Sequence, residues 1–167
     1  MKGHIYLIGF MGTGKSTVSK ALKKKIGWKE IDVDAMIERE QKMAISDIFT
    51  AYGEEHFRDI ETETMERIGT MDPAIVSCGG GAVLRSQNVE NMKKSGTIVL
   101  LTAKAHTVYK RVKGSKDRPI LNGHMNVEYI KLLMKKRQDI YEKACDVSIS
   151  TDGKTPDRIA REIISRI

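Results

Sequence analysis

Residues 9–16 read Gly9-Phe10-Met11-Gly12-Thr13-Gly14-Lys15-Ser16, which is the spacing G-x-x-x-x-G-K-[ST] of a phosphate-binding loop, or P-loop. The apolar run 5–8 before this stretch predicts a short buried strand, and residues 15–26 after it have apolar side chains at helical spacing. The alternative is a glycine-rich turn before an ordinary amphipathic helix. The placement of the motif between a strand and a helix argues against that alternative.

Each residue type in this motif has a role in holding a nucleotide. Glycines let successive backbone N–H groups turn inward around a phosphate, and the following helix directs its free N–H groups and positive dipole end at the same anion. Lys15 can reach the β- and γ-phosphates, and the Ser16 hydroxyl can ligate Mg²⁺. The sequence therefore predicts that the chain binds a nucleoside triphosphate.

Length and composition are typical of one domain, which we expect to span residues 1–167. The 167 residues are 40% hydrophobic and 31% charged. The two cysteines, Cys78 and Cys145, have no metal-binding spacing and imply no disulfide framework, so we expect a reducing, cytoplasmic compartment. No apolar stretch approaches the ~20 residues that cross a bilayer, so we expect no membrane partner.

The net charge of +7 permits a nucleic-acid partner. The basic residues are scattered, however, and aromatic residues make up only 5% of the chain, so platforms for stacking bases are scarce. Most basic side chains are expected on solvated helix faces, where they attract anionic nucleotides and metabolites. We therefore expect small anionic ligands and no nucleic acid.

Strand-like and helix-like segments alternate along the chain. Short apolar runs predict strands near residues 5–8, 30–33, 74–78, 97–101 and 147–150. Helical patterns lie near residues 15–26, 35–69, 86–95, 104–113, 126–144 and 156–166. This alternation is typical of an α/β fold with a mainly parallel sheet and helices on both faces.

Two stretches interrupt this alternation. Residues 45–68 are too many for a single crossover helix and have a charge pattern of their own. Residues 114–123 are polar, with glycines at both ends and Arg118 between them. An ordinary surface loop would explain the second stretch, but glycine hinges around an arginine favour a mobile lid that closes over bound phosphates.

Two carboxylates, Asp32 and Asp34, follow the second expected strand. Because side chains alternate along a strand, both should point to one side of the sheet, at the carboxyl edge where open α/β sheets bind ligands. One could hold the hydration shell of Mg²⁺, while the other orients a substrate hydroxyl or accepts its proton. The alternative is that Asp34 only caps a helix beginning at Ala35.

Glycines and arginines supply further candidate contacts. The run Gly79-Gly80-Gly81 follows the third expected strand and leaves backbone amides exposed to a substrate oxygen, although a flexible turn would explain it equally. Arg58, Arg118 and Arg137 are candidate clamps, because a guanidinium grips carboxylate or phosphate in a bidentate fork. Each could instead be solvated, and Arg58 could pair with Glu54 or Glu61 along a helix.

In order and spacing, five motifs together resemble the shikimate kinase family. They are Ile8-Gly9-Phe10-Met11-Gly12-Thr13-Gly14-Lys15-Ser16, Asp32-Val33-Asp34, Phe57-Arg58-x-x-Glu61, Gly79-Gly80-Gly81-Ala82 and Arg118-Pro119-Ile120-Leu121. The resemblance spans essentially the whole chain. It implies the P-loop fold of nucleoside-monophosphate kinases, a three-layer α/β sandwich with a five-stranded parallel sheet in the order 2-3-1-4-5. It also implies a helical substrate-binding region near residues 33–61 and a mobile lid near 114–123.

The resemblance further implies ATP-dependent phosphorylation of the 3-hydroxyl of shikimate to shikimate 3-phosphate and ADP, a step towards chorismate and the aromatic amino acids. The partners would be ATP, with Mg²⁺, and shikimate, and the chain would act as a monomer. The alternatives are another small-molecule P-loop kinase, such as gluconate kinase, or a nucleotide-binding regulator without catalysis. The set of Asp34, Arg58, the glycine run and Arg137 favours shikimate, and intact Lys15, Ser16, Asp34 and Arg118 argue against the regulator.

Carried onto this sequence, the resemblance assigns a role to each candidate residue. It assigns catalysis to Lys15, Asp34 and Arg118. It assigns ATP binding to Gly12, Thr13, Gly14, Lys15, Ser16, Thr17, Arg111, Arg118 and Pro156, with Arg111 and Pro156 on either side of the adenine. It assigns shikimate binding to Asp34, Arg58, Gly79, Gly80, Gly81 and Arg137, and Mg²⁺ binding to Ser16 and Asp32.

Overall fold

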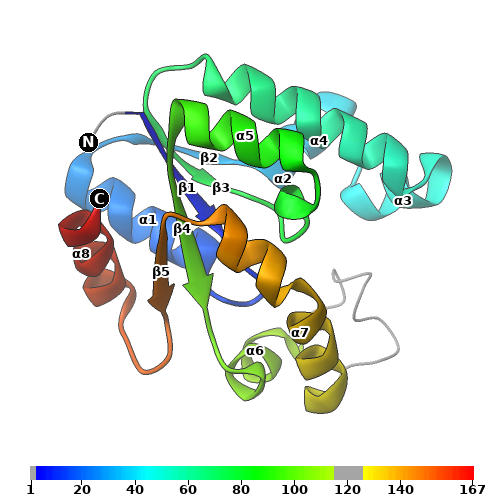
Figure 1. The fold of residues 1–167 in the computed structure, drawn as a ribbon. Helices are drawn as coiled ribbons and strands as arrows, with labels where there is room; N and C mark the ends of the chain where they lie inside the picture. Colours follow the sequence, from blue (N-terminus) through cyan, green and yellow to red (C-terminus); the bar gives the residue numbers. More distant parts are fainter. Residues whose placement is uncertain (1–2, 115–125) are drawn as a thin grey trace.

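Five parallel strands form one sheet in the order β2-β3-β1-β4-β5 in the computed structural model, which describes residues 3–114 and 126–167 (Figure 1). The strands are β1 (His4–Ile8), β2 (Lys29–Asp32), β3 (Ala74–Ser77), β4 (Gly96–Thr102) and β5 (Val147–Ser150). The helices are α1 (Lys15–Ile26), α2 (Val33–Gln41), α3 (Ile45–Tyr52), α4 (Glu54–Gly69), α5 (Ser86–Ser95), α6 (Ala105–Val112), α7 (Val127–Ala144) and α8 (Pro156–Arg166), with a short 3₁₀ helix η1 (Ala82–Leu84). The predicted α/β class, the parallel sheet and its strand order are confirmed.

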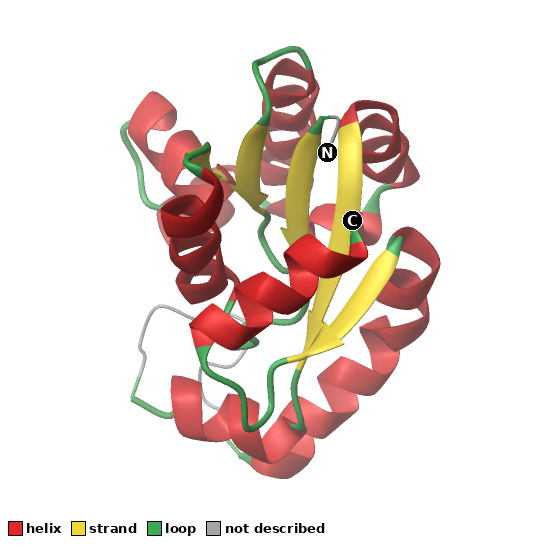
Figure 2. Cartoon of the chain, turned by 90° about the vertical axis from the view of Figure 1, so that its left-hand side faces the viewer, coloured by secondary structure: helices red, strands yellow, loops and turns green. Residues whose placement is uncertain are grey.

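Helices cover both faces of the sheet (Figure 2). The central strand β1 is accordingly buried on both of its sides. Every residue of β1 is buried, and its side chains alternate between two apolar cores. Tyr6 and Ile8 enter the core under α4, α5 and α7, whereas Ile5 and Leu7 enter the core under α1 and α8. Such a strand has no solvent-facing side, which is why it reads as an unbroken apolar run.

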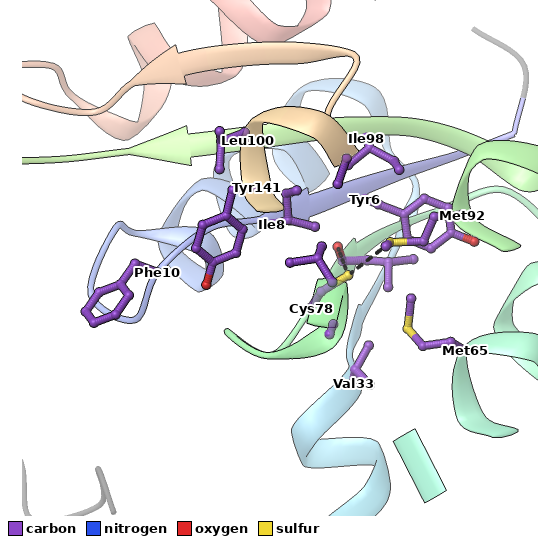
Figure 3. Close-up of a cluster of buried hydrophobic side chains, with 14 of the residues drawn as sticks. Tyr6, Ile8, Phe10, Val33, Met65, Cys78, Met92, Ile98, Leu100 and Tyr141 are labelled. Atoms are coloured by element: carbon purple, nitrogen blue, oxygen red, sulfur yellow. Dashed lines mark hydrogen bonds between the residues drawn. The ribbon is translucent and has the colours of Figure 1, made fainter. Parts of the chain in front are cut away.

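The core that contains Tyr6 and Ile8 lies between the sheet and the helices α4 and α7, which carry the predicted substrate-binding residues Arg58 and Arg137. Figure 3 shows Cys78 packed in it beside Met92 and Met65. The Cys78 thiol faces the carbonyl of Val76 and the sulfur of Met92, and burial raises its pKa far above the ordinary value. Cys78 is therefore a small core residue and has no thiolate for chemistry.

The carboxyl ends of three neighbouring strands meet at one edge of the sheet. Leu7 of β1 lies opposite Ser77 of β3, and Ser77 lies opposite Asp32 of β2. The three connections that leave these strands therefore begin side by side. This register brings together the P-loop, the Asp32–Asp34 segment and the glycine run, as expected for a ligand site in an open α/β sheet.

The helical pattern expected near residues 35–69 is divided into three helices, in agreement with the expectation that residues 45–68 are too many for a single crossover helix. Helix α2 ends at Lys42, which has a left-handed backbone with φ of 53°, and α3 ends at Gly53, with φ of 85°. Each of these residues turns the chain and lets the next helix start in a new direction. Within the described residues, no helix is both long enough and apolar enough to cross a membrane.

The start of α2 also differs from the expectation. The helix begins at Val33, and the Asp32 Oδ1 accepts a hydrogen bond of 3.0 Å from the Ala35 amide. The capping residue is therefore Asp32, not Asp34, and Asp34 lies in the first helical turn. Because Asp34 is helical, the alternation of side chains along a strand does not determine where its side chain points. The side chain still lines the cavity at the same edge of the sheet.

The core between the sheet and the helices α1 and α8 can be tested by shortening a buried side chain. Leu22 of α1 is 0% exposed, so Leu22→Ala should lower the free energy of unfolding by about 2–5 kcal/mol through lost burial and a residual cavity. The matched change Leu132→Ala, at a side chain 50% exposed on α7, should cost far less. Urea unfolding of both variants measures this difference, and equal losses would contradict the burial argument.

Candidate active site

The P-loop wraps around the amino end of α1 and leaves that end open to an anion. Gly14 precedes the helix with φ of 100°, a conformation that side chains disfavour. Among the described residues no side chain caps α1, and its first turn contains no acidic residue. The helix N–H groups and the positive end of its dipole therefore face the loop without a competing carboxylate, as a phosphate site requires.

Side chains of the loop itself hold its shape. The Lys15 Nζ donates to the carbonyl oxygens of Gly9 (2.8 Å) and Phe10 (3.1 Å), which places the ammonium group against the loop. Thr13 is buried, and its hydroxyl donates to the Phe10 carbonyl at 2.8 Å. The Thr13 amide also donates to the Phe10 carbonyl, at 3.3 Å, so the side chain and the backbone of Thr13 both hold the turn of the loop.

A cavity of about 480 Å³ lies beside the P-loop and gathers most of the predicted site residues. Its lining includes Gly12, Gly14, Lys15, Ser16, Thr17, Asp32, Asp34, Gly79, Gly80 and Arg111. The nucleotide-side candidates therefore share one space with Asp34, Gly79 and Gly80, whereas Arg58, Gly81 and Arg137 are not part of its lining. Such a cavity lets a γ-phosphate and an acceptor group approach each other.

Asp34 is a half-buried carboxyl that lines this cavity, and its Oδ1 is buried. Burial raises its pKa to about 6, and the nearby Glu61 and Asp32 carboxylates contribute to the rise, while Lys15 and Arg58 oppose it. Within the described residues its Oδ1 has no hydrogen-bond partner. A carboxyl that lines the cavity and ionises near neutrality is suited to accept a hydrogen bond or a proton from a substrate hydroxyl.

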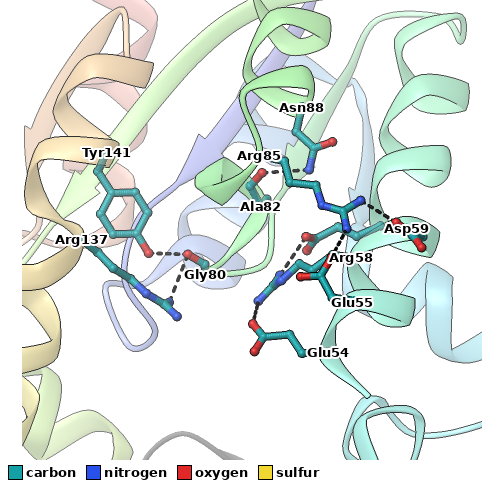
Figure 4. Close-up of polar contacts among 11 residues, drawn as sticks. Glu54, Glu55, Arg58, Asp59, Gly80, Ala82, Arg85, Asn88, Arg137 and Tyr141 are labelled. Carbon is teal, nitrogen blue, oxygen red and sulfur yellow. Dashed lines mark hydrogen bonds and ion pairs between the residues drawn. The ribbon is translucent and has the colours of Figure 1, made fainter. Parts of the chain in front are cut away.

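Arg58 is held on α4 by two carboxylates of its own helix, so the predicted pairing is confirmed with both partners (Figure 4). Its Nη1 donates to Glu61 Oε1 at 2.8 Å, and its Nη2 donates to Glu54 Oε1 at 3.3 Å. Arg58 and Glu61 are both buried, unlike an ordinary surface pair. The guanidinium is therefore fixed in place beside the cavity.

Two of the three glycines make room for these charged side chains. A Cβ at Gly79 would lie 2.8 Å from Asp34 Oδ1 and 3.3 Å from Glu61 Oε2. A Cβ at Gly81 would lie 2.6 Å from the Arg58 Cζ. A side chain at Gly79 would therefore displace Asp34 or Glu61, and one at Gly81 would displace Arg58, from its place against the loop backbone.

Gly80 instead joins the loop to α7. Its carbonyl oxygen accepts hydrogen bonds from the Tyr141 hydroxyl and, at 3.4 Å, from the Arg137 Nη1 (Figure 4). Arg137 thus approaches the loop from the side opposite to Arg58. Sequence reasoning missed Tyr141, although its position four residues after Arg137 places both on one helix face. It also treated Glu61 only as a pairing partner of Arg58.

The remaining predicted nucleotide-side residues have varied positions. The Arg111 Nη1 donates to the Gly12 carbonyl (3.0 Å) and to the Thr151 hydroxyl (3.2 Å), which places α6 against both the P-loop and the connection after β5. Pro156 is the first residue of α8, at the end of that connection. Arg118, with nearly all of the expected lid 114–123, lies outside the described residues.

Comparison with known proteins identifies the family. The family model described as shikimate kinase matches residues 11–167. This chain belongs to the shikimate kinase family. A shikimate kinase of Persephonella marina is 45% identical over 164 residues, which cover 98% of each chain. The family assignment makes this chain a kinase, as the P-loop predicts.

Solved structures agree with the assignment. The shikimate kinase from Acinetobacter baumannii, in complex with shikimate, superposes with a TM-score of 0.93 at 30% identity, covering 99% of this chain and 92% of that one. A gluconokinase from Sinorhizobium meliloti has a TM-score of 0.60 at 18% identity over 98% of this chain and 90% of its own, a likeness of fold alone. The family and the structural similarity favour the shikimate kinase prediction over the gluconate kinase alternative.

The pKa of Asp34 tests the electrostatics of the site directly. We expect its carboxyl carbon to titrate in NMR spectra with a pKa of about 6. Glu61→Gln should lower this pKa, because it removes a negative charge that disfavours the Asp34 carboxylate and leaves Arg58 less neutralised. Glu63→Gln, at an exposed position of α4, serves as the control and should leave it unchanged. An Asp34 pKa at the ordinary 3.8 in the unaltered chain would contradict the effects assigned to burial and to Glu61.

Proposed function

We propose that this chain transfers the γ-phosphoryl group of ATP to the 3-hydroxyl of shikimate and releases shikimate 3-phosphate and ADP. This reaction is a step in the synthesis of chorismate and the aromatic amino acids. The observation that carries the proposal is one cavity shared by a P-loop and the half-buried carboxyl of Asp34, with the buried Arg58 beside it. The likeness to a kinase solved in complex with shikimate supports this choice of acceptor.

ATP lies with its phosphates in the P-loop. The backbone N–H groups of Gly12, of Gly14 and of residues 15–17 at the amino end of α1 hold the phosphate oxygens, and Lys15 reaches the β- and γ-phosphates. Arg111 and Pro156 flank the adenine, a placement that agrees with the contact of Arg111 with Thr151 in the connection before α8. Arg118 supplies positive charge to the transferring phosphoryl group.

Shikimate is a small acid with hydroxyl groups, so it needs cations at one end and a carboxylate at the other. Arg58 from α4 and Arg137 from α7 bind its carboxylate from the two sides of the glycine loop (Figure 4). Backbone groups of Gly79, Gly80 and Gly81 contact the ring substituents. Asp34 holds the 3-hydroxyl, which positions the acceptor oxygen towards the P-loop.

The transfer itself needs one proton acceptor and little covalent chemistry. The 3-hydroxyl oxygen bonds to the γ-phosphorus while the bond from that phosphorus to the β-bridging oxygen breaks, and ADP leaves. Asp34, with a pKa of about 6, is ionised at neutral pH and accepts the hydroxyl proton. Lys15 and Arg118 stabilise the charge on the phosphoryl oxygens.

Ser16 and Asp32 are the residues that would hold Mg²⁺. Both line the cavity, and one Asp32 oxygen caps α2, which orients the carboxylate. The oxygen donors of these two side chains fit a hard cation that takes its other ligands from phosphates and water. When bound, Mg²⁺ would neutralise charge on the β- and γ-phosphates.

Release of ADP with different acceptors tests the proposal. We expect Mg²⁺-dependent turnover with shikimate and none with gluconate, nucleoside monophosphates or no acceptor. Asp34→Asn should lower kcat by about 10²-fold or more, because general-base groups contribute typically 10²–10⁴-fold. Asp72→Asn, at an exposed position outside the cavity, is the control and should retain activity. ATP binding without shikimate turnover would refute the proposal, and turnover with gluconate alone would identify a different kinase.

A second variant tests the placement of Arg58. Gly81→Ala leaves the backbone unstrained, since φ is −100°, but its Cβ would displace the Arg58 guanidinium. We expect the KM for shikimate to rise by about tenfold or more, because hydrogen bonds to charged groups are worth about 1.5–3 kcal/mol, while the KM for ATP stays within about twofold. Gly69→Ala, at the last residue of α4, is the matched control, because φ there is not positive and a Cβ would meet only the Ser95 side chain, at an ordinary contact distance of 3.4 Å. An unchanged KM for shikimate in Gly81→Ala would show that Arg58 does not bind the acceptor.

A further inference from the structure

Tyr141 and Arg137 reach the same backbone oxygen from one face of α7. The Tyr141 hydroxyl donates to the Gly80 carbonyl, and the Arg137 Nη1 donates to it at 3.4 Å (Figure 4). The second bond is long, and Arg137 is only half-buried, so it holds the loop weakly by itself. The Tyr141 bond is therefore the firmer link between α7 and a loop 61 residues earlier in the chain.

The surroundings of Tyr141 keep its hydroxyl a permanent donor. The side chain is 5% exposed, and burial raises its pKa above the ordinary value of 10.0, although the Arg137 charge opposes the shift. The phenol therefore stays protonated at any pH at which the enzyme is expected to work. A carbonyl oxygen can only accept, so the bond has one fixed direction.

The same loop connects Tyr141 to the other arginine. Gly80 takes the bonds from α7, and the next residue, Gly81, packs directly against Arg58 of α4. The Gly80 position also lies close to the P-loop, since a Cβ there would be 3.8 Å from the Met11 amide nitrogen. A shift of Gly80 would therefore change the position of Arg137 relative to Arg58.

We propose that Tyr141 is a positioning residue for the shikimate side of the site: its hydroxyl ties α7 to Gly80 and so sets the spacing between Arg137 and Arg58. The proposal rests on the proposed function, in which these two arginines bind the shikimate carboxylate. Tyr141 lies outside all five sequence motifs. It takes no part in the transfer of the phosphoryl group.

Tyr141→Phe is the direct test, because it keeps the buried ring and removes only the hydroxyl. We expect the KM for shikimate to rise about three- to tenfold, the range that loss of one hydrogen bond produces. The value of kcat should change less than about twofold, and the KM for ATP should not change. An unchanged KM for shikimate, or an equal rise in the KM for ATP, would overturn the proposal.

Tyr6→Phe is the matched control for general loosening of the fold. Tyr6 is also buried, and its hydroxyl shares a hydrogen bond of 2.6 Å with Ser95 of α5, away from the cavity. We expect Tyr6→Phe to lower the melting temperature without raising the KM for shikimate. A rise equal to that of Tyr141→Phe would assign both effects to lost stability and would overturn the proposal.

A double-mutant cycle that combines Tyr141→Phe with Arg137→Lys tests whether Tyr141 affects shikimate binding through Arg137. If Tyr141 acts through the position of Arg137, the KM increase in the double variant is smaller than the product of the two single increases. Increases that simply multiply would overturn the coupling. A wild-type chain inactive with shikimate would overturn the proposed function and this inference with it, whereas an active wild type with an unaffected Tyr141→Phe variant would overturn this inference alone.

Discussion

The proposed acceptor side of the site depends on a buried ion pair. Arg58 is 6% exposed, and its charge is balanced by the fully buried Glu61 and by Glu54. Without such partners, a buried guanidinium would cost several kcal/mol. Glu61 also lies across Gly79 from Asp34 and raises the pKa of that carboxyl. One ion pair therefore fixes the position of the arginine and adjusts the proton affinity of the carboxyl.

These buried charges also explain why three glycines follow β3. Each position serves a different neighbour: Gly79 makes room for two carboxylates, Gly81 makes room for the guanidinium, and Gly80 offers its carbonyl to α7. A turn that was merely flexible would not need a glycine at each of these particular positions. The loop instead has packed side chains on both flanks, so its shape is set by α2 and α4 on one side and by α7 on the other.

Much of the fold could be predicted because its signals are local. The strands β1, β3 and β4 read as apolar runs, whereas β2 has Ile31 as its one apolar residue and β5 alternates apolar residues with serine. The P-loop has its required strand and helix, and the strand order came from the resemblance to a family. The three helices within residues 33–69 were not predicted as such. Val33 favours a strand, so the helix was expected to begin at Ala35 with Asp34 as a candidate cap, whereas it begins at Val33 with Asp32 as the cap. Lys42 adopts a left-handed backbone without being glycine, and only Gly53 marked a break.

The residues of the candidate site are also held by two kinds of contact, local ones within a helix and distant ones between segments. Arg58 is positioned by residues three and four places away on one helix, so its pairs were visible in the sequence. Tyr141 acts on a residue 61 positions away, and nothing in the spacing of either segment predicts that contact. The two arginines are thus held in different ways, one within its helix and one through a contact between segments. The ion pairs of Arg58 lie within one helix, so they should change little between variants of this chain. Under the proposal for Tyr141, variants should therefore differ in their affinity for the acceptor mainly through α7, where the buried Tyr141 hydroxyl sets the distance between Arg137 and Arg58.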